Sequence, residues 1–175
     1  FNWNITDGGP KCITLFDGPD TTAPEIVNGQ AQAIDFGSTS TTKTRTFTIL
    51  NNQATDINSV QITVPGAGFV ASAVIVSITG GSSQTFTLDL AGGVNTYAET
   101  ATITSPDIPV PFLFDVVGEV TAAPEPEIAV FEGPNVLGTI ILDGQPTPLD
   151  LGYQIKGNSL MSEFTITNIG DAVLN

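Results

Sequence analysis

Ile13-Thr14-Leu15-Phe16-Asp17-Gly18-Pro19 recurs further along the chain as Ile128-Ala129-Val130-Phe131-Glu132-Gly133-Pro134. At this offset of 115 residues, nine of the 25 positions in 13–37 carry the same residue in 128–152. Such self-similarity at a fixed spacing is typical of a structural unit that occurs more than once in a chain. The sequence therefore predicts two copies of one fold.

The repeat resumes after a two-residue insertion, at an offset of 117. Phe47-Thr48-Ile49 meets Phe164-Thr165-Ile166, and Ile57 falls opposite Leu174. We expect a complete first unit over residues 11–122 and the first part of a second unit over residues 123–175. The junction around Ala122-Ala123-Pro124-Glu125-Pro126 is short, and its prolines make it stiff.

The first unit reads as short strands separated by turn signals. Phe86, Leu88 and Leu90 alternate with Thr85, Thr87 and Asp89, and Phe112, Phe114 and Val116 fall on one face of the last strand, which is the period of a half-buried strand. The expected strands are Cys12–Phe16, Gln32–Phe36, Thr42–Leu50, Ile57–Val64, Phe69–Val76, Ser83–Leu90, Glu99–Thr104 and Val110–Val120. Seven or eight strands in a unit of this size favour an all-β, immunoglobulin-like sandwich, with a β-barrel as the alternative.

Three motifs, taken in order, resemble a known family. They are Pro126-Glu127-Ile128 at the start, Ile34-Asp35-Phe36-Gly37 in the middle, and a threonine-rich strand that ends in Phe47-Thr48-Ile49-Leu50-Asn51. The chain resembles the ASH, or Hydin-like, immunoglobulin-type domains, and in particular the choice-of-anchor D repeats of bacterial surface proteins. The resemblance covers nearly everything from residue 11 onward. The first copy lacks the glycine that the second has at Gly170, so the turn after Asn51 can differ.

The resemblance implies a sandwich module strung in tandem on a large secreted protein at a bacterial cell surface. The composition suits that setting. The chain has 18 acidic and four basic residues, and its formal net charge is −14. A charge of this sign disfavours nucleic acid and anionic lipid as partners. No stretch reaches the length of a membrane span, so we expect no membrane insertion.

Catalysis is not expected from this set of side chains. The chain contains no histidine, which removes the Ser-His-Asp and Cys-His arrangements and the usual zinc ligands. The recurring carboxylates Asp35 and Asp150 fall in the Asp-Phe/Leu-Gly element, where a turn role is expected. We predict no enzyme activity and no cofactor.

Calcium is the one ion that the sequence leaves open. Asp17 and Asp20 lie in an acidic turn that recurs in the second unit at Glu132, and hard cations bind carboxylate and carbonyl oxygens. The spacing matches no known calcium loop, and Asp-Gly and Gly-Pro are also ordinary turn residues.

The lone cysteine, Cys12, lies in an apolar stretch and is expected to be a small buried strand residue. Residues 1–10 are expected to be a linker or the end of a preceding module, and Phe1-Asn2-Trp3-Asn4-Ile5 could add as a strand to another domain.

These features together predict a structural or adhesive spacer in an extracellular repeat protein, whose partners are neighbouring repeats or other copies of the chain. Two alternatives remain open: a surface filament assembled by strand complementation, and a sandwich whose loops bind a glycan or a protein. Aromatic side chains exposed together at one end would favour the binding module, whereas buried aromatic side chains would favour the spacer. The apolar strands of the second unit are expected to be completed by further strands of the same chain or by a partner.

Overall fold

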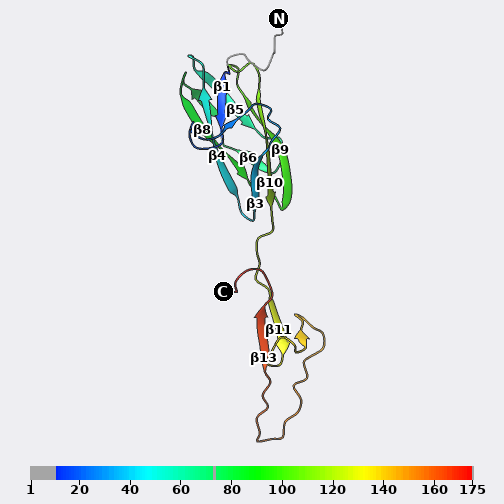
Figure 1. Ribbon diagram of the computed structural model, residues 1–175. Coiled ribbons are helices and arrows are strands. Elements are labelled where there is room, and N and C mark those ends of the chain that lie inside the picture. Colours follow the sequence, from blue (N-terminus) through cyan, green and yellow to red (C-terminus); the bar gives the residue numbers. More distant parts are fainter. Residues whose placement is uncertain (1–10, 73, 175) are drawn as a thin grey trace. The chain divides into compact units, whose positions relative to one another are not determined.

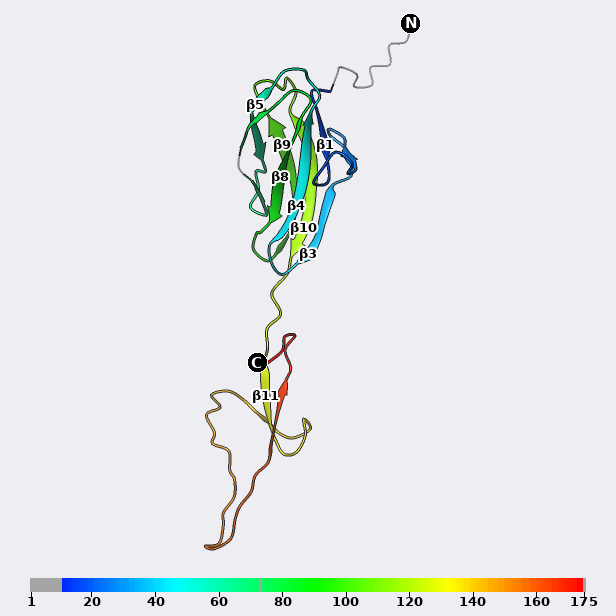
Figure 2. The ribbon, with the colours of Figure 1, turned by 90° about the vertical axis from the view of Figure 1, so that its left-hand side faces the viewer.

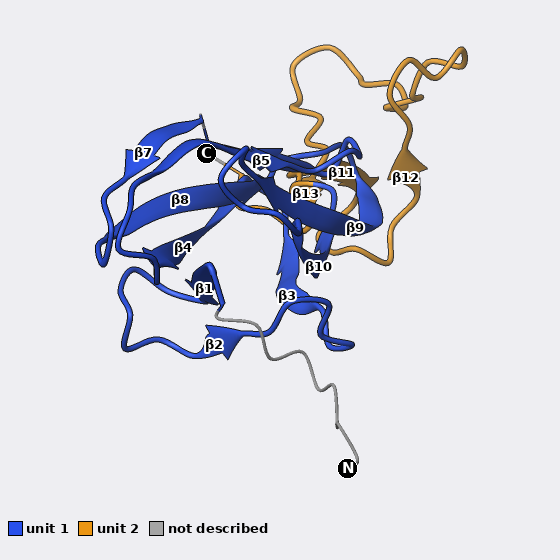
Figure 3. Cartoon of the chain, turned by 90° about the horizontal axis from the view of Figure 1, so that it is seen from above, with its two compact units in different colours: residues 1–122 blue, residues 123–175 orange. Residues whose placement is uncertain are grey.

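The computed structural model describes residues 11–72 and 74–174, and these residues contain strands and turns but no helix. The predicted all-β sandwich class is confirmed. The chain divides into two compact units, Phe1–Ala122 and Ala123–Asn175 (Figure 3). The predicted N-terminal segment, 1–10, lies outside the described residues. No helix in the part that is described is long or apolar enough to cross a membrane.

Unit 1 contains two five-stranded sheets that pack face to face (Figures 1 and 2). The first sheet has the order β2-β1-β4-β8-β6, in which all neighbouring strands are antiparallel. Its strands are β1 (Ile13–Phe16), β2 (Glu25–Ile26), β4 (Lys43–Asn51), β6 (Phe69–Ala71) and β8 (Ser83–Leu90). The predicted strand Ser83–Leu90 is found with those bounds, and its alternate residues Phe86, Leu88 and Leu90 are buried.

The second sheet has the order β3-β10-β9-β5-β7. Its strands are β3 (Ile34–Thr39), β5 (Ile57–Thr63), β7 (Ile75–Ile78), β9 (Asn95–Thr104) and β10 (Phe112–Val120). The pairing of β3 with β10 is parallel, whereas the other neighbours are antiparallel. Phe112, Phe114 and Val116 all face the core, as the alternation predicts.

Aromatic side chains from the two sheets meet in the middle of the sandwich. Phe47 of β4 stacks on Phe86 of β8 with ring centroids 5.3 Å apart, and it lies 5.6 Å from Phe114 of the facing sheet. Phe36 of β3 meets Phe69 of β6 edge-on at 5.0 Å. These contacts join the sheets into one core, and burial of such large apolar side chains is the main stabilising contribution to the unit.

The prediction of a single strand over Phe69–Val76 is wrong. β6 and β7 belong to different sheets, and the chain crosses from one to the other between them. The residue pairs of the β6–β8 ladder end at Ala71. Ser72 makes the last bonds to β8: its amide donates to the Thr87 carbonyl at 2.9 Å, and its hydroxyl accepts from the Thr87 amide at 2.9 Å.

Strand β5 carries an irregularity that resets its alternation. Ser59 has a φ of +52°, and the pairing with β7 steps from Asn58–Ser77 to Val60–Ile75. The register with β7 is the same on both sides of Ser59, so the irregularity is a local distortion of the backbone and not an inserted residue. As a result, Ile57 and Val60 both face the core although three positions separate them.

Unit 2 has one three-stranded sheet, in the order β12-β11-β13. Its strands are β11 (Ile128–Glu132), β12 (Ile140–Ile141) and β13 (Phe164–Asn168). Val130 pairs with Ile141 and with Ile166, as Leu15 pairs with Ile26 and with Ile49 in unit 1. The strand pairing therefore follows the sequence offsets of 115 and 117 in register.

Candidate functional site

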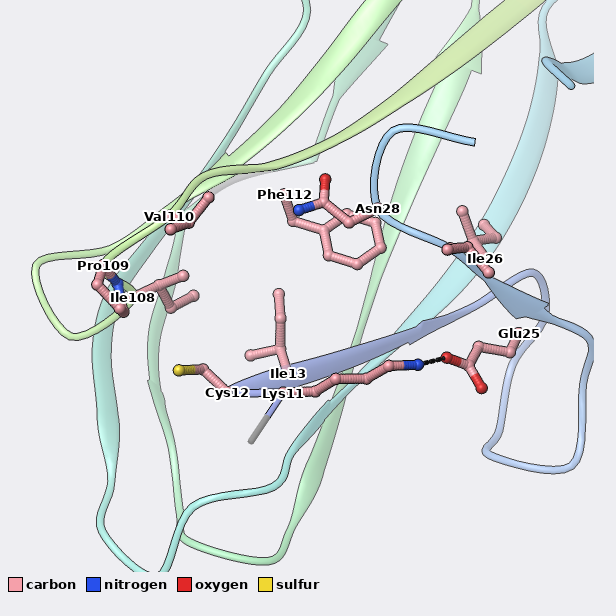
Figure 4. Close-up of a pocket in the computed structure, with 11 residues that line it drawn as sticks. Lys11, Cys12, Ile13, Glu25, Ile26, Asn28, Ile108, Pro109, Val110 and Phe112 are labelled. Atoms are coloured by element: carbon pink, nitrogen blue, oxygen red, sulfur yellow. Dashed lines mark hydrogen bonds and ion pairs between the residues drawn. The ribbon is translucent and has the colours of Figure 1, made fainter. Parts of the chain in front are cut away.

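A cavity of about 330 Å³ lies in unit 1, between the start of β1, strand β2 and the segment that leads into β10 (Figure 4). The apolar side chains of Ile13, Ile26, Ile108 and Phe112 line it. All four are buried, so the cavity wall is continuous with the sandwich core. A hollow of this size and lining suits a small apolar group.

Charged groups lie at the opening of this cavity. The Lys11 ammonium pairs with the Glu25 carboxylate across it (Figure 4), and both side chains are largely exposed. Exposed ion pairs of this kind contribute little to stability. The opening of the cavity is therefore lined by one ammonium group, that of Lys11, and one carboxylate, that of Glu25.

Cys12 differs from its prediction. It precedes β1 instead of lying within a strand, and it is partly exposed at the cavity wall (Figure 4). The apolar run from Ile13 begins the strand, and only from there do the β1–β4 pairings start. Cys12 is a free thiol.

Asn28 holds the far wall of the cavity in place. Its Oδ1 accepts from the Leu113 amide at 2.8 Å, and the Gly29 amide donates to the Leu113 carbonyl at 2.8 Å. These bonds tie the turn after β2 to the start of β10, in the opposite sheet. The cavity is thus a built feature of the sandwich end, with walls from both sheets.

The three candidate calcium ligands do not form one site. The Asp17 carboxylate accepts from the Arg45 guanidinium at 2.5 Å. Asp20 caps its own turn, accepting from the Thr22 amide at 2.8 Å and hydroxyl at 2.6 Å, and these bonds lower the pKa of Asp20. Glu132 lies in unit 2. Residues 11–72 and 74–174 hold no cluster of three or more potential metal-ligating side chains, and calcium binding stays a prediction.

Asp35 and Asp150 have the turn role expected for them. The Gly37 amide donates to the Asp35 carboxylate at 2.6 Å, and the Gly152 amide donates to the Asp150 carboxylate at 2.8 Å. Gly37 and Gly152 adopt φ angles of +68° and +81°, which side chains other than that of glycine disfavour. The Asp-x-Gly element is therefore a local turn in both units.

The aromatic rings of unit 1 bear on the choice between a spacer and a binding module. Among the described residues of unit 1, every phenylalanine from Phe36 to Phe114 is buried, whereas Phe16 and Tyr97 are partly exposed. No group of fully exposed aromatic rings lies at either end of the described sandwich. The described phenylalanine side chains of unit 1 thus lie mainly in the core.

Most of the exposed large apolar side chains among the described residues lie in unit 2, at positions that the repeat pattern placed in a core. Its exposed large apolar side chains include Ile128, Leu151, Phe164, Ile166 and Leu174. The matching positions in unit 1 are Ile13, Phe36, Phe47, Ile49 and Ile57, all of which are buried.

Comparison with known proteins gives similar folds only. No protein-family profile matches the chain, and no curated protein matches its sequence. An ASH/PapD-like domain of human CEP192 (PapD-like domain 7) is 13% identical, with a TM-score of 0.49, over 70% of this chain and 94% of that one. A Porphyromonas gingivalis protein of unknown function is 14% identical, with a TM-score of 0.47, over 67% of this chain and 51% of that one. The E. coli chaperone DraB is 16% identical, with a TM-score of 0.37, over 55% and 61%.

Proposed function

We propose that the chain is a pair of neighbouring structural repeats from a large extracellular bacterial protein, in which stacked sandwiches act as a non-catalytic spacer. The observation that carries this proposal is the agreement of the two units in strand register. The pairs Leu15–Ile49 and Val130–Ile166 occupy equivalent positions, although one lies in a full sandwich and the other in a three-stranded sheet. Tandem copies of one unit are the simplest means of building length.

Side-chain chemistry supports a spacer. The aromatic rings of the sandwich serve its core, and the outward positions of β4 and β8 carry threonine and aspartate, as in the hydrogen bond of Thr44 to Asp89 at 2.6 Å. A net charge of −14 keeps such a surface hydrated and disfavours self-association.

Unit 1 is also arranged to bear load. Its first strand, β1, belongs to one sheet, and its last strand, β10, belongs to the other and leaves at the opposite end (Figures 1 and 2). Tension applied at residues 11 and 121 would therefore act along the strands, so that several ladder hydrogen bonds of β1 with β4 and of β10 with β9 share it.

Export is the part of the proposal that a cell experiment tests. Antibodies raised against residues 11–122 should label intact cells of the source bacterium, and protease added to those cells should remove the label. Label that appears only after lysis would contradict an extracellular spacer. A cytoplasmic protein of the same cells, probed in parallel, shows that the cells were intact.

The exposed apolar face of unit 2 favours a second candidate, a filament in which strands of one chain complete the sandwich of the next. In that case, the purified chain would form long assemblies whose growth a deletion of unit 2 abolishes. A chain that stays monomeric at high concentration would exclude this alternative.

A further inference from the structure

The cavity of unit 1 is apolar inside and reaches solvent along an apolar rim (Figure 4). Ile13, Ile108 and Phe112 form its inner wall and are buried, whereas Val27 and Val110 also line it and are 53% and 66% exposed. Its volume is about 330 Å³. An apolar cavity of about 150 Å³ holds a benzene ring. The cavity of unit 1 therefore has room for one large apolar group with a short polar end.

Recognition of a polar group falls to the opening of this cavity. The Asn28 side chain at the far wall is already engaged, because its Oδ1 accepts from the Leu113 amide at 2.8 Å and its Nδ2 donates to the Pro111 carbonyl at 3.4 Å. The ion pair of Lys11 and Glu25 lies at the opening, and these side chains are 58% and 41% exposed. Such a pair contributes little to stability, so a ligand can insert its own charges at small cost.

The charged opening is not a requirement of the fold that the two units share. At the repeat offset of 115, the isoleucines of β1 and β2 that line the cavity recur as isoleucines in unit 2. Lys11 and Glu25 correspond instead to Pro126 and Ile140, which carry no charge. The ion pair therefore belongs to unit 1 alone of the two, and the strand pairing that both units have does not explain it.

The adjacent ammonium and carboxylate select the charge of a ligand. A ligand carboxylate that pairs with Lys11 also lies near Glu25, which repels it, and a ligand ammonium that pairs with Glu25 is repelled by Lys11 in the same way. A ligand that carries both charges meets an opposite charge on each side. Hydrogen bonds between charged groups are also stronger than those between neutral groups.

We propose that this cavity is a binding site for a small zwitterion with one large apolar group, that is, a free α-amino acid of the size of phenylalanine or leucine. The apolar side chain enters the space between Ile13, Ile108 and Phe112. The ligand carboxylate accepts from Lys11, and the ligand ammonium donates to Glu25. The site goes beyond the spacer function and does not depend on it, because all of its residues lie in unit 1.

Protection of Cys12 measures binding. It is the one cysteine of the chain, and it is a free thiol at the cavity wall. Methyl methanethiosulfonate, a neutral thiol reagent, modifies it, and mass spectrometry of the full chain follows the rate. We expect phenylalanine to slow this reaction until the effect saturates. Amide chemical shifts of Gly29 and Leu113, at the far wall, provide a second readout for a ligand that leaves the thiol accessible.

Three analogues of phenylalanine test the charges of the ligand. Phenylpropionate lacks the ammonium, phenylethylamine lacks the carboxylate, and N-acetylphenylalanine amide carries neither charge. Each should need a concentration about tenfold higher than phenylalanine for the same protection, because each loses at least one charge-assisted hydrogen bond.

Two variants at the opening should exchange these preferences. Glu25→Gln should weaken phenylalanine and strengthen phenylpropionate, whose carboxylate is no longer repelled. Lys11→Gln should weaken phenylalanine and strengthen phenylethylamine for the corresponding reason. The matched control is Glu119→Gln, which removes an exposed carboxylate that does not line the cavity and should leave all four ligands unchanged. Thermal unfolding of each variant shows that unit 1 is folded.

The proposal is overturned if phenylalanine neither protects Cys12 nor shifts the Gly29 and Leu113 amides. It is also overturned if N-acetylphenylalanine amide binds as well as phenylalanine does, because the occupant would then be an apolar side chain of a polypeptide. Unchanged preferences in Glu25→Gln and Lys11→Gln would show that the ion pair does not recognise the ligand. The cell labelling tests the spacer function separately.

Discussion

The two units share their local structure and differ in what surrounds it. The Thr48 hydroxyl donates to the Gly18 carbonyl at 2.7 Å, and the Thr165 hydroxyl donates to the Gly133 carbonyl at 2.8 Å. Thr48 is nonetheless buried, whereas Thr165 is partly exposed. The difference shows that strand pairing and turns are set by nearby residues, while burial depends on the second sheet.

The largest expected effect comes from the central ring. Phe47→Ala should destabilise unit 1 by about 3–5 kcal/mol, because it removes a buried ring from the contacts with Phe86 and Phe114. Phe164→Ala, at the matching position, should cost less than about 1 kcal/mol, because that ring is already partly in water. Urea unfolding of the full chain, followed by circular dichroism, measures both.

If Phe164→Ala lowered the free energy of unfolding as much as Phe47→Ala does, the contrast between the two units would be wrong, because Phe164 would then be covered in solution. Phe47→Leu serves as a milder variant if Phe47→Ala does not fold. It keeps most of the apolar volume and should lose less stability than the alanine variant does.

A smaller effect is expected from the paired asparagines. Asn51 is fully buried and donates to the Thr55 and Ile78 carbonyls at 2.8 and 2.9 Å. Asn51→Ala leaves these carbonyls without that donor and should cost about 1–3 kcal/mol in thermal unfolding. Asn168→Ala should change stability by less than about 0.5 kcal/mol, because water replaces its bonds. Equal losses of stability from Asn51→Ala and Asn168→Ala would mean that the two turns do not differ in the stability they gain from burial.

The Arg45 side chain makes contacts in unit 1 that its counterpart in unit 2 is too short to make. Its guanidinium donates to the Asp35 carbonyl at 2.7 Å and lies 5.5 Å from the centre of the Phe36 ring. Its counterpart in unit 2 is Ser162. Arg45→Met should cost about 1 kcal/mol, because the ion pair with Asp17 is partly exposed and screened. A loss that does not shrink at high salt would show that the packing of the side chain matters more than its charge.

The repeat register could be predicted from the sequence because the matching residues make local contacts. Phe47 and Ile49 alternate with threonine, and the Asp35-x-Gly37 turn is closed by its own side chain. The absence of a glycine after Asn51 suggested a different turn there. The Gln53 amide nevertheless donates to Asn51 Oδ1, as the Gly170 amide does to Asn168 Oδ1.

Features that depend on distant pairing could not be predicted. Residues 69–76 form one nearly continuous apolar run with Ser72 as its one polar residue, so nothing in their pattern indicates that β6 and β7 belong to different sheets. Strand β2 has two residues and is defined by its pairing with β1 alone. The cavity depends on contact between the turn at Asn28 and the start of β10, which lie 85 residues apart.

The smallest effect concerns one turn that is charged in unit 1 and neutral in unit 2. The Thr22 hydroxyl and amide donate to Asp20 and hold the pKa of this carboxyl below its ordinary value. At the matching place, the Leu137 amide donates to Asn135 Oδ1 at 2.9 Å. A lowered pKa in the folded state means that the charged turn is favoured at neutral pH. That advantage is lost as the pH falls through the pKa of the folded state.

The Thr22 amide should therefore titrate in an NMR experiment with a midpoint below that of an aspartate in an unstructured peptide. The Leu137 amide should show no such titration, because an asparagine side chain does not ionise in this range. Asp20→Asn makes the first turn like the second and should abolish the Thr22 titration while leaving the fold intact. If Thr22 instead titrates with the midpoint of an unstructured aspartate, the hydrogen bonds of its turn do not favour the charged carboxylate, and the charge at this position makes no difference between the units.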